Sequence, residues 1–373
     1  MSDLFKTSLV DALGLNRTTY SVPGLNSTNT VHGVIPINTT YSGWDSELGS
    51  LAPAGSSFST TREVARIGRS ILNSTLLPRS QTRRWLKPRT FTSGSNVGVG
   101  APWEMFRTHI ASANRTVDLY TKNGGWGAYG TILVLIPDYN VGFSILSASA
   151  AGESPSTIFF LANIISQRVI PALEDVAREQ ARDMFAGTYT YRYNADININ
   201  ASSLSSSSSS SSDITLNSSL TITMDDNQPG LRVTRWTSNG TDFLNGVFNS
   251  AHLNPTTTTT TNTYVDFRLQ PNNLYSTPLS PSPAPRGDGK AKVEVGFTGT
   301  WSVMPRQVHT GPFDLSCMSW GGDDTLTYGN VGIAQFVFEL DPVTGRVVSV
   351  RPEAMRITLD KVNNGSASTA NTT

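Results

Sequence analysis

Residues 117–148 decide the fold of the first half of this chain, and they read VDLYTKNGGWGAYGTILVLIPDYNVGFSILSA. The segments TILVLIP and VGFSILSA are rich in branched side chains and are joined at Pro137-Asp138-Tyr139-Asn140. The segment VDLYTK precedes them and runs into a glycine-rich stretch. Branched and aromatic runs separated by Gly, Pro and Asn are typical of strands joined by turns. The stretch therefore predicts three consecutive antiparallel strands.

The glycine-rich part of this stretch, Gly125–Gly130, also matches the G-x-G-x-x-G dinucleotide fingerprint. That fingerprint holds a pyrophosphate only where a helix begins directly after it. The segment that follows is branched, short and closed by Pro137, so it predicts a strand instead. We interpret the glycines as a tight turn and expect no nucleotide cofactor.

Helical spacing of apolar residues appears on both sides of the predicted strands. Gly14 is expected to end the first of these helices, and Ser59 or Thr60 to cap the start of the second. Pro171 would end one helix and restart another. The helices are expected at residues 5–13, 61–73, 79–86, 156–169 and 171–184.

Past Gly187 the sequence changes to short alternating segments, which are typical of an all-β barrel or sandwich. Polar runs separate them, namely Ser205–Ser212, Thr256–Thr261 and SPSPAPRGDGK, and these predict loops. We therefore expect two domains, an α/β domain over residues 1–186 and a β-rich, barrel-like domain over residues 187–373. The expected strands lie in GTYTYRY, DITLNSSLTITM, GLRVTRWT, TYVDFRLQ, KVEVGFTGTW, IAQFVFEL and GRVVSVRP.

The composition argues against several classes of partner. Lys and Arg number 28 and Asp and Glu also number 28, so the chain lacks the positive charge of a nucleic-acid binder. The single cysteine, Cys317, excludes an internal disulfide, and the four dispersed histidines predict no metal site. Apolar runs such as Ile132–Ile136 are far shorter than the roughly 18 residues that span a bilayer, so no membrane span is expected. We expect no cofactor.

Several features favour an extracellular location. The chain has 45 Ser and 44 Thr, only six Lys, and ten Asn-x-Ser/Thr acceptors for N-linked glycans. The first residues, MSDLFKTSLVDALGL, lack the charged and apolar regions of a signal peptide. A secreted composition without a secretion signal predicts a chain that is missing its true beginning.

The candidate site lies just before the glycine-rich turn, at Tyr120-Thr121-Lys122-Asn123-Gly124-Gly125. A lysine at a strand end can stabilise an anion, and the N–H of a nearby glycine can point at an oxyanion. A lysine at a strand end is also commonly solvated, and the residues alone leave both interpretations open.

Four segments, in order, resemble the serine β-lactamase and penicillin-binding-protein-like family, in particular its class C-type branch. Lys122-Asn123-Gly124 resembles the family's Lys-Thr-Gly triplet at the sheet edge, and the hairpin after it resembles the family's long hairpin. Upstream, LVDALGLNRTTY, PAGSSFSTTREVARIG and NVGVGAPWE resemble further segments of that family. The β-rich remainder resembles the C-terminal domain of fungal secreted β-lactamase-like proteins.

This resemblance implies a partial β-lactamase/transpeptidase-like domain followed by a barrel-like domain. It implies a serine hydrolase that cleaves an amide or ester of a small molecule or peptide through an acyl-enzyme. Lys122 and the N–H of Gly125 would be catalytic, and Lys122, Asn123 and Gly124 would contact the substrate.

The sequence departs from the family where the nucleophile is expected. No Ser-x-x-Lys occurs, and Thr358-Leu-Asp-Lys361 has only its spacing. Tyr328-Gly-Asn330 matches the family's Tyr-x-Asn but lies about two hundred residues after Lys122, so we interpret it as a coincidence. The chain is therefore predicted to be the C-terminal portion of such a hydrolase, inactive by itself. The alternative hypothesis is a non-catalytic extracellular glycoprotein with a β-barrel binding or packing module.

Overall fold

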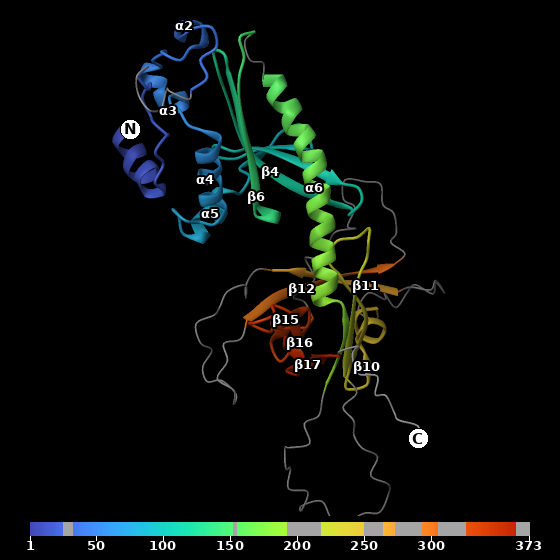
Figure 1. The fold of residues 1–373 in the computed structure, drawn as a ribbon. Helices are drawn as coiled ribbons and strands as arrows, with labels where there is room; N and C mark the ends of the chain where they lie inside the picture. The colour runs from blue at the N-terminus through green and yellow to red at the C-terminus, as the bar shows by residue number, and fades with distance from the viewer. Residues whose placement is uncertain are drawn as a thin grey trace, which may run out of the picture. The chain divides into compact units, whose positions relative to one another are not determined.

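The computed structural model describes residues 1–24, 33–151, 155–191, 218–249, 264–272, 293–304 and 326–362. The chain divides into two compact units, Met1–Asp175 and Val176–Thr373, and Figure 1 shows their helices and strands. The predicted Ser-rich, Thr-rich and Pro-rich loops lie outside the described residues, as does Cys317.

A six-stranded antiparallel sheet forms the centre of the first unit, in the order β1-β2-β3-β4-β5-β6. The three strands predicted over residues 117–148 are confirmed as β4, β5 and β6, and the three before them were not predicted from the sequence. The strands are β1 (Thr90–Phe91), β2 (Val97–Val99), β3 (Glu104–Ile110), β4 (Arg115–Trp126), β5 (Tyr129–Ile136) and β6 (Val141–Ala148).

Helices cover both faces of this sheet, with α4 (Thr61–Leu72) on one side and α6 (Pro155–Phe185) on the other (Figure 1). Strand β5 supplies apolar side chains to both faces. Leu135 is buried with Trp103 in the core on the α4 side, while Ile132 packs in the core that includes α6. A strand segment buried on both faces is apolar at every position, which is why Ile132–Ile136 of β5 form an unbroken apolar run.

The predicted helices before the sheet are confirmed. The first begins as α1 (Ser2–Phe5), continues as the π-helix η1 (Lys6–Asp11) and ends near Gly14, whose φ is +60°. The Thr60 side chain caps α4 by accepting the N–H of Glu63 at 3.3 Å. The remaining helices of this part are α2 (Thr39–Ser42), η2 (Gly49–Leu51), α3 (Ala52–Gly55) and α5 (Arg79–Trp85).

The glycine-rich stretch is mostly strand rather than turn, which corrects the sequence-based interpretation. Gly124 and Gly125 pair with Thr131 and Gly130 of β5, and only residues 127–128 form the turn. Gly127 has a φ of +56°, a conformation that favours glycine. A strand and not a helix follows the stretch, in agreement with the interpretation that it is no dinucleotide site.

Helix α6 is one continuous helix of 31 residues, although two helices separated at Pro171 were expected. Proline removes one backbone hydrogen bond, but Ile158, Ala162 and Ile170 pack against the sheet before that position. After it, the buried Glu174 accepts the hydroxyl of Tyr139. The part of α6 from residue 156 to 185 is long and apolar enough to cross a membrane, judged by length and composition alone. The sequence predicted no membrane span, because its uninterrupted apolar runs are short.

The second unit is a closed eight-stranded barrel with a short additional strand, β10. Its strands follow the order β9-β11-β12-β15-β16-β17-β7-β8, and β8 pairs with β9 to close the ring. The predicted barrel class is confirmed. The strands are β7 (Gly187–Thr190), β8 (Ser219–Met224), β9 (Leu231–Ser238), β10 (Thr241–Asp242), β11 (Tyr264–Pro271), β12 (Val293–Met304), β15 (Gln335–Leu340), β16 (Val347–Pro352) and β17 (Leu359–Lys361).

Aromatic side chains fill the barrel. Trp236 lies 5.0 Å from Phe336 and 5.7 Å from Phe267 between ring centres, and all three are buried. The helix η5 (Phe243–Phe248) adds Phe248, whose ring lies 4.9 Å from that of Phe267. An interior filled in this way is a packed core and not a channel.

Candidate functional site

The candidate site lies where β4 extends past its neighbour β3. Thr121 is the last β4 residue with a β3 partner, Glu104, and beyond it the described part of β4 pairs with β5 alone. Among the described strands, residues 122–126 therefore have one edge without a partner, which we call the open edge of β4. All four predicted site residues, Lys122 to Gly125, lie along it.

Glu104 closes the start of this edge with both carboxylate oxygens. Its Oε1 accepts the Lys122 ammonium at 2.5 Å, and its Oε2 accepts the N–H of Asn123 at 3.1 Å. Lys122 Nζ also donates to the Asn123 carbonyl at 3.0 Å. The lysine side chain is 46% exposed, so it is held in place and still reaches solvent.

Backbone groups of alternate strand residues point to the same edge. Because the N–H of Asn123 points to the open edge, where it meets Glu104, the N–H of Gly125 points there as well. A fixed cation and an N–H donor thus lie along one edge. Such a pair can stabilise negative charge that develops on an oxygen placed between them.

The site has a second face, on the side of the sheet covered by α6. Asn123, Gly124 and Gly125 line a small hollow of about 90 Å³, and Ile158 and Phe159 of α6 lie on its other side. A Cβ on Gly124 would lie 2.9 Å from Thr131 Oγ1, so a side chain there would displace the Thr131 hydroxyl.

The tip of the β4–β5 hairpin is held by an N-terminal segment. Trp126 Nε1 donates to the Gly43 carbonyl at 3.2 Å, and the N–H of Ala128 donates to the Ser42 carbonyl at 3.0 Å. The Tyr129 hydroxyl donates to the Val34 carbonyl at 2.9 Å, and burial raises the pKa of this phenol. These contacts fix the end of the open edge.

Glu63 joins two of the segments that carry the family resemblance. Its buried carboxylate accepts the N–H groups of Asn16 and Arg17 and, at 2.5 Å, the hydroxyl of Thr18. The segment LVDALGLNRTTY is thereby attached to the start of α4. Neither Glu63 nor Glu104 was predicted as a site residue, because each acts on a partner distant in sequence.

Other sequence candidates are placed as follows. Tyr328 is 62% exposed, and Tyr328-Gly-Asn330 forms the turn between β13 (Thr327–Tyr328) and β14 (Val331–Gly332) of the second unit. Within the described residues, no group of three or more His, Cys, Asp or Glu side chains could hold a metal ion. His32, His252 and His309 lie outside those residues.

An antiparallel sheet covered by helices on both faces, followed by a closed barrel, defines a β-lactamase/transpeptidase-like protein with a C-terminal β-barrel domain. A β-lactamase family model matches residues 1–161, and the model of the C-terminal domain of β-lactamase-like proteins matches residues 177–363. The chain belongs to the β-lactamase-like family.

The relatives that it matches include longer fungal proteins. The chain is 28% identical over 329 residues to a β-lactamase-like protein of Arthroderma benhamiae, covering 87% of this chain and 51% of that protein. It is 27% identical over 357 residues to a probable hydrolase, M10, of Phoma sp., covering 95% of this chain and 52% of the relative. The chain thus spans about half the length of these relatives.

Among solved structures, the chain is similar to a D-stereospecific amidohydrolase from Streptomyces sp. The TM-score is 0.34 at 16% identity, and the match covers 45% of this chain and 48% of that one.

Proposed function

We propose that this chain forms the C-terminal part of a β-lactamase-related serine hydrolase, which cleaves an amide or ester through an acyl-enzyme. One observation carries the proposal. The Lys122 ammonium and the N–H of Gly125 lie on the same open edge of β4, which is the arrangement needed to stabilise an acyl-transfer oxyanion. The hollow beside Asn123 and Gly124 is the place proposed for part of the small-molecule or peptide substrate.

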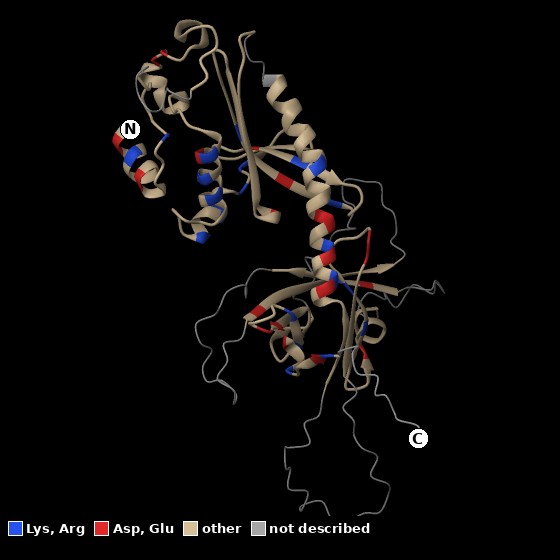
Figure 2. Cartoon of the chain, viewed as in Figure 1, with Lys and Arg blue, Asp and Glu red and all other residues tan. Residues whose placement is uncertain are grey.

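The nucleophile is proposed to lie outside residues 1–373, because no Ser-x-x-Lys occurs within them. Two features of the first unit support an additional segment. Strand β6 pairs only with β5 among the described residues, so its outer edge lacks a partner strand. On α6, Phe160 is 63% exposed and Ile164 is 45% exposed, and Figure 2 shows no charge over the first turns of this helix.

The proposal predicts that purified 1–373 does not hydrolyse β-lactams or short-chain esters above background. Without a covalent nucleophile no acyl-enzyme can form, so neither a burst nor turnover is expected. The measurement is a pre-steady-state assay with an activated ester, together with a serine-directed phosphonate probe. A stoichiometric burst or a labelled serine would show that the chain carries its own nucleophile.

The role of Lys122 is tested in a completed protein, in which the upstream half of a fungal relative precedes residues 1–373. We expect Lys122→Ala to lower kcat/KM by about 10²-fold or more, because it removes a cation beside the developing charge. Lys87→Ala, which removes an exposed lysine of the same unit, is the matched control and should leave kcat/KM unchanged.

Two outcomes of this experiment lead to other conclusions. Equal and small effects of Lys122→Ala and Lys87→Ala would assign Lys122 to the solvated surface. A completed, folded protein that is not acylated by any ester or amide probe would instead support a non-catalytic extracellular glycoprotein, whose barrel serves as a binding or packing module.

A further inference from the structure

The structure describes five of the ten Asn-x-Ser/Thr sequences, and in all five the asparagine is exposed. They also differ in a way that the sequence does not show. In the acceptor Asn16-Arg17-Thr18, the Thr18 residue is only 5% exposed, and its hydroxyl donates to the Glu63 carboxylate. In the other four, both the asparagine and its threonine are exposed. These four are Asn38 with Thr40, Asn73 with Thr75, Asn114 with Thr116, and Asn239 with Thr241.

Each of the four asparagines lies at the end of an element or in a turn. Asn38 caps the start of α2, and Asn73 lies at the end of α4. Asn114 is in the β3–β4 turn with a φ of +47°, and Asn239 is in the β9–β10 turn with a φ of +49°. A bulky group attached at such positions extends into solvent and displaces no core side chain.

The hydrogen bonds of Asn38 and Asn73 are compatible with modification. Asn38 Oδ1 accepts the N–H of Tyr41 at 2.8 Å, and Asn73 Oδ1 accepts from Asn140 at 3.5 Å. Both contacts use the amide oxygen, whereas an N-linked sugar is attached to Nδ2. A sugar on Nδ2 therefore leaves the α2 cap in place.

From this geometry we infer that Asn38, Asn73, Asn114 and Asn239 are attachment sites for N-linked glycans. The donor is a lipid-linked oligosaccharide diphosphate, and a membrane transferase of the secretory pathway catalyses the step. The bond between the anomeric carbon and the phosphate oxygen breaks, and a bond from that carbon to Nδ2 forms. Nδ2 loses one proton to a base of the transferase, and the lipid diphosphate leaves with the bonding electrons.

The open edge of β4, strand β6 and α6 contain no acceptor asparagine. No Asn-x-Ser/Thr sequence occurs between Asn114 and Asn200, a stretch that contains the open edge of β4, strand β6 and α6. No proposed glycan is therefore attached to these elements themselves, although Asn73 accepts from Asn140, the residue before β6. The inference is independent of catalysis, since it requires only passage through the secretory pathway.

The test uses the full chain, expressed in a eukaryotic cell behind a cleavable secretion signal. Protein from cells and medium together is treated with peptide N-glycosidase in ¹⁸O-labelled water, which converts each glycosylated asparagine to labelled aspartate. Peptide mass spectrometry should find the label at all four asparagines. Absence of label at a site overturns the assignment of that site, and absence at all four overturns the inference.

Matched variants separate the acceptor requirement from an effect on folding. Thr116→Ala removes the acceptor hydroxyl and should abolish label at Asn114, whereas Thr116→Ser keeps a hydroxyl and should retain the label. Thr241→Ala and Thr241→Ser make the same comparison for Asn239. Asn140 is exposed and has a φ of +54° but belongs to no acceptor sequence, so it should stay unlabelled. Label at Asn140, or label that survives Thr116→Ala, would show that the signal is not N-glycosylation.

Discussion

At the scale of single residues, Gly127 shows how the candidate site depends on one backbone position. It forms the tip of the β4–β5 hairpin with a φ of +56°. A Cβ at this position would lie 2.2 Å from the Ser42 carbonyl oxygen, whose bond to Ala128 holds the hairpin. Both the conformation and the close approach require glycine.

We expect backbone strain in Gly127→Ala to destabilise the first unit by about 1–3 kcal/mol. The loss should exceed this strain cost, because the added Cβ also forces Ser42 to move. Gly49→Ala is the matched control, since Gly49 has a φ of +53° in the same unit and no atom within 4 Å of an added Cβ. The measurement is urea unfolding followed by tryptophan fluorescence. Equal losses for the two variants would show that the contact with Ser42 is unimportant.

Burial of the Tyr189 phenol should make the barrel less stable to unfolding at alkaline pH. The side chain is fully buried in the barrel, and its hydroxyl donates to the Phe185 carbonyl at 2.6 Å. Burial raises the pKa of this phenol above its ordinary value of 10. The unfolded chain therefore loses the phenolic proton first, so the stabilisation is present below about pH 10 and is lost as the pH rises further.

The variant Tyr189→Phe removes both the hydrogen bond and the ionisable group. We expect it to be less stable than the parent by about 1 kcal/mol at pH 8, and this difference should shrink above pH 10. Tyr328→Phe, at a 62% exposed position of the same unit, should follow the parent protein at every pH. A difference for Tyr189→Phe that is constant from pH 8 to pH 11 would contradict the argument.

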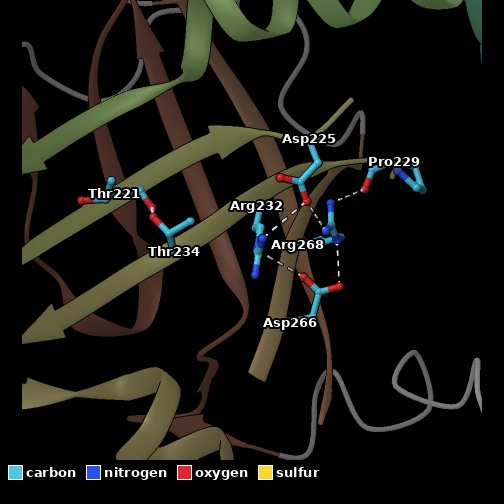
Figure 3. Close-up of polar contacts among 7 residues, drawn as sticks. All are labelled: Thr221, Asp225, Pro229, Arg232, Thr234, Asp266 and Arg268. Carbon is cyan, nitrogen blue, oxygen red and sulfur yellow. Dashed lines mark hydrogen bonds and ion pairs between the residues drawn. The ribbon is translucent and has the colours of Figure 1, made fainter. Parts of the chain in front are cut away.

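At the scale of elements, a charged network joins strand β11 to the β8–β9 turn (Figure 3). Arg268 is only 9% exposed and donates to Asp225 at 2.5 Å and to Asp266 at 3.0 Å. Arg232 lies opposite Arg268 on β9 and shares both aspartates at 3.7–3.8 Å. Two cations placed side by side on adjacent strands repel each other, so the aspartates are needed to compensate them.

Removing one aspartate should therefore destabilise the barrel. We expect Asp225→Asn to cost about 3 kcal/mol, because it leaves the buried Arg268 short of a counter-ion. Asp226→Asn, at the next residue, removes a pair in which Arg182 and Asp226 are 46% and 86% exposed, and it should cost less than about 0.5 kcal/mol. Chemical denaturation of both variants would test this, and comparable losses would argue against a special role for the network.

At the scale of the whole molecule, α6 contributes to the core of each unit. Ile158, Ala162 and Ile170 pack in the core beneath the sheet. Phe185 packs in the barrel, where its ring centre lies 5.1 Å from that of Phe297 and 5.0 Å from that of Phe338. The predicted boundary at residue 187 would therefore separate the barrel from one of its core aromatic residues.

This packing predicts which barrel fragment folds best. A fragment of residues 176–373 should be soluble with a cooperative melt, because its ring of strands closes without the first unit. A fragment of residues 187–373 should also fold but melt lower, since losing a buried phenylalanine costs about 3–5 kcal/mol. Calorimetry of the two fragments makes the comparison, and equal melting temperatures would show that Phe185 is dispensable.

The isolated first unit should behave differently. Among the described strands β6 pairs with β5 alone and so has one open edge, and α6 exposes Phe160, Leu161 and Ile164. An open edge and exposed apolar side chains favour association, so a fragment of residues 1–186, which contains the first unit and the whole of α6, should aggregate or bind a hydrophobic dye. A monomeric fragment with a cooperative melt would identify this unit as a complete, diverged domain and would count against an additional segment.

The sequence by itself determined the local structure and the class of fold. Strand β5, the turn at Pro137–Asn140, the cap at Thr60 and the alternating segments of the barrel depend on side-chain spacing and turn residues, which act over short distances. Strands of only three residues, such as β2 and β17, are too short to show such a pattern. They form because neighbouring strands offer them hydrogen-bonding partners.

Only the tertiary structure decided what surrounds Lys122. The sequence located the lysine and the glycines, but Glu104 reaches them through the register of β3 and β4, and Ser42 and Gly43 reach the hairpin tip across 80 residues or more of chain. The continuity of α6 through Pro171 and the exposure of its apolar side chains were likewise decided by packing. Contacts between distant segments depend on how whole elements pack together, and no local pattern of residues encodes that arrangement.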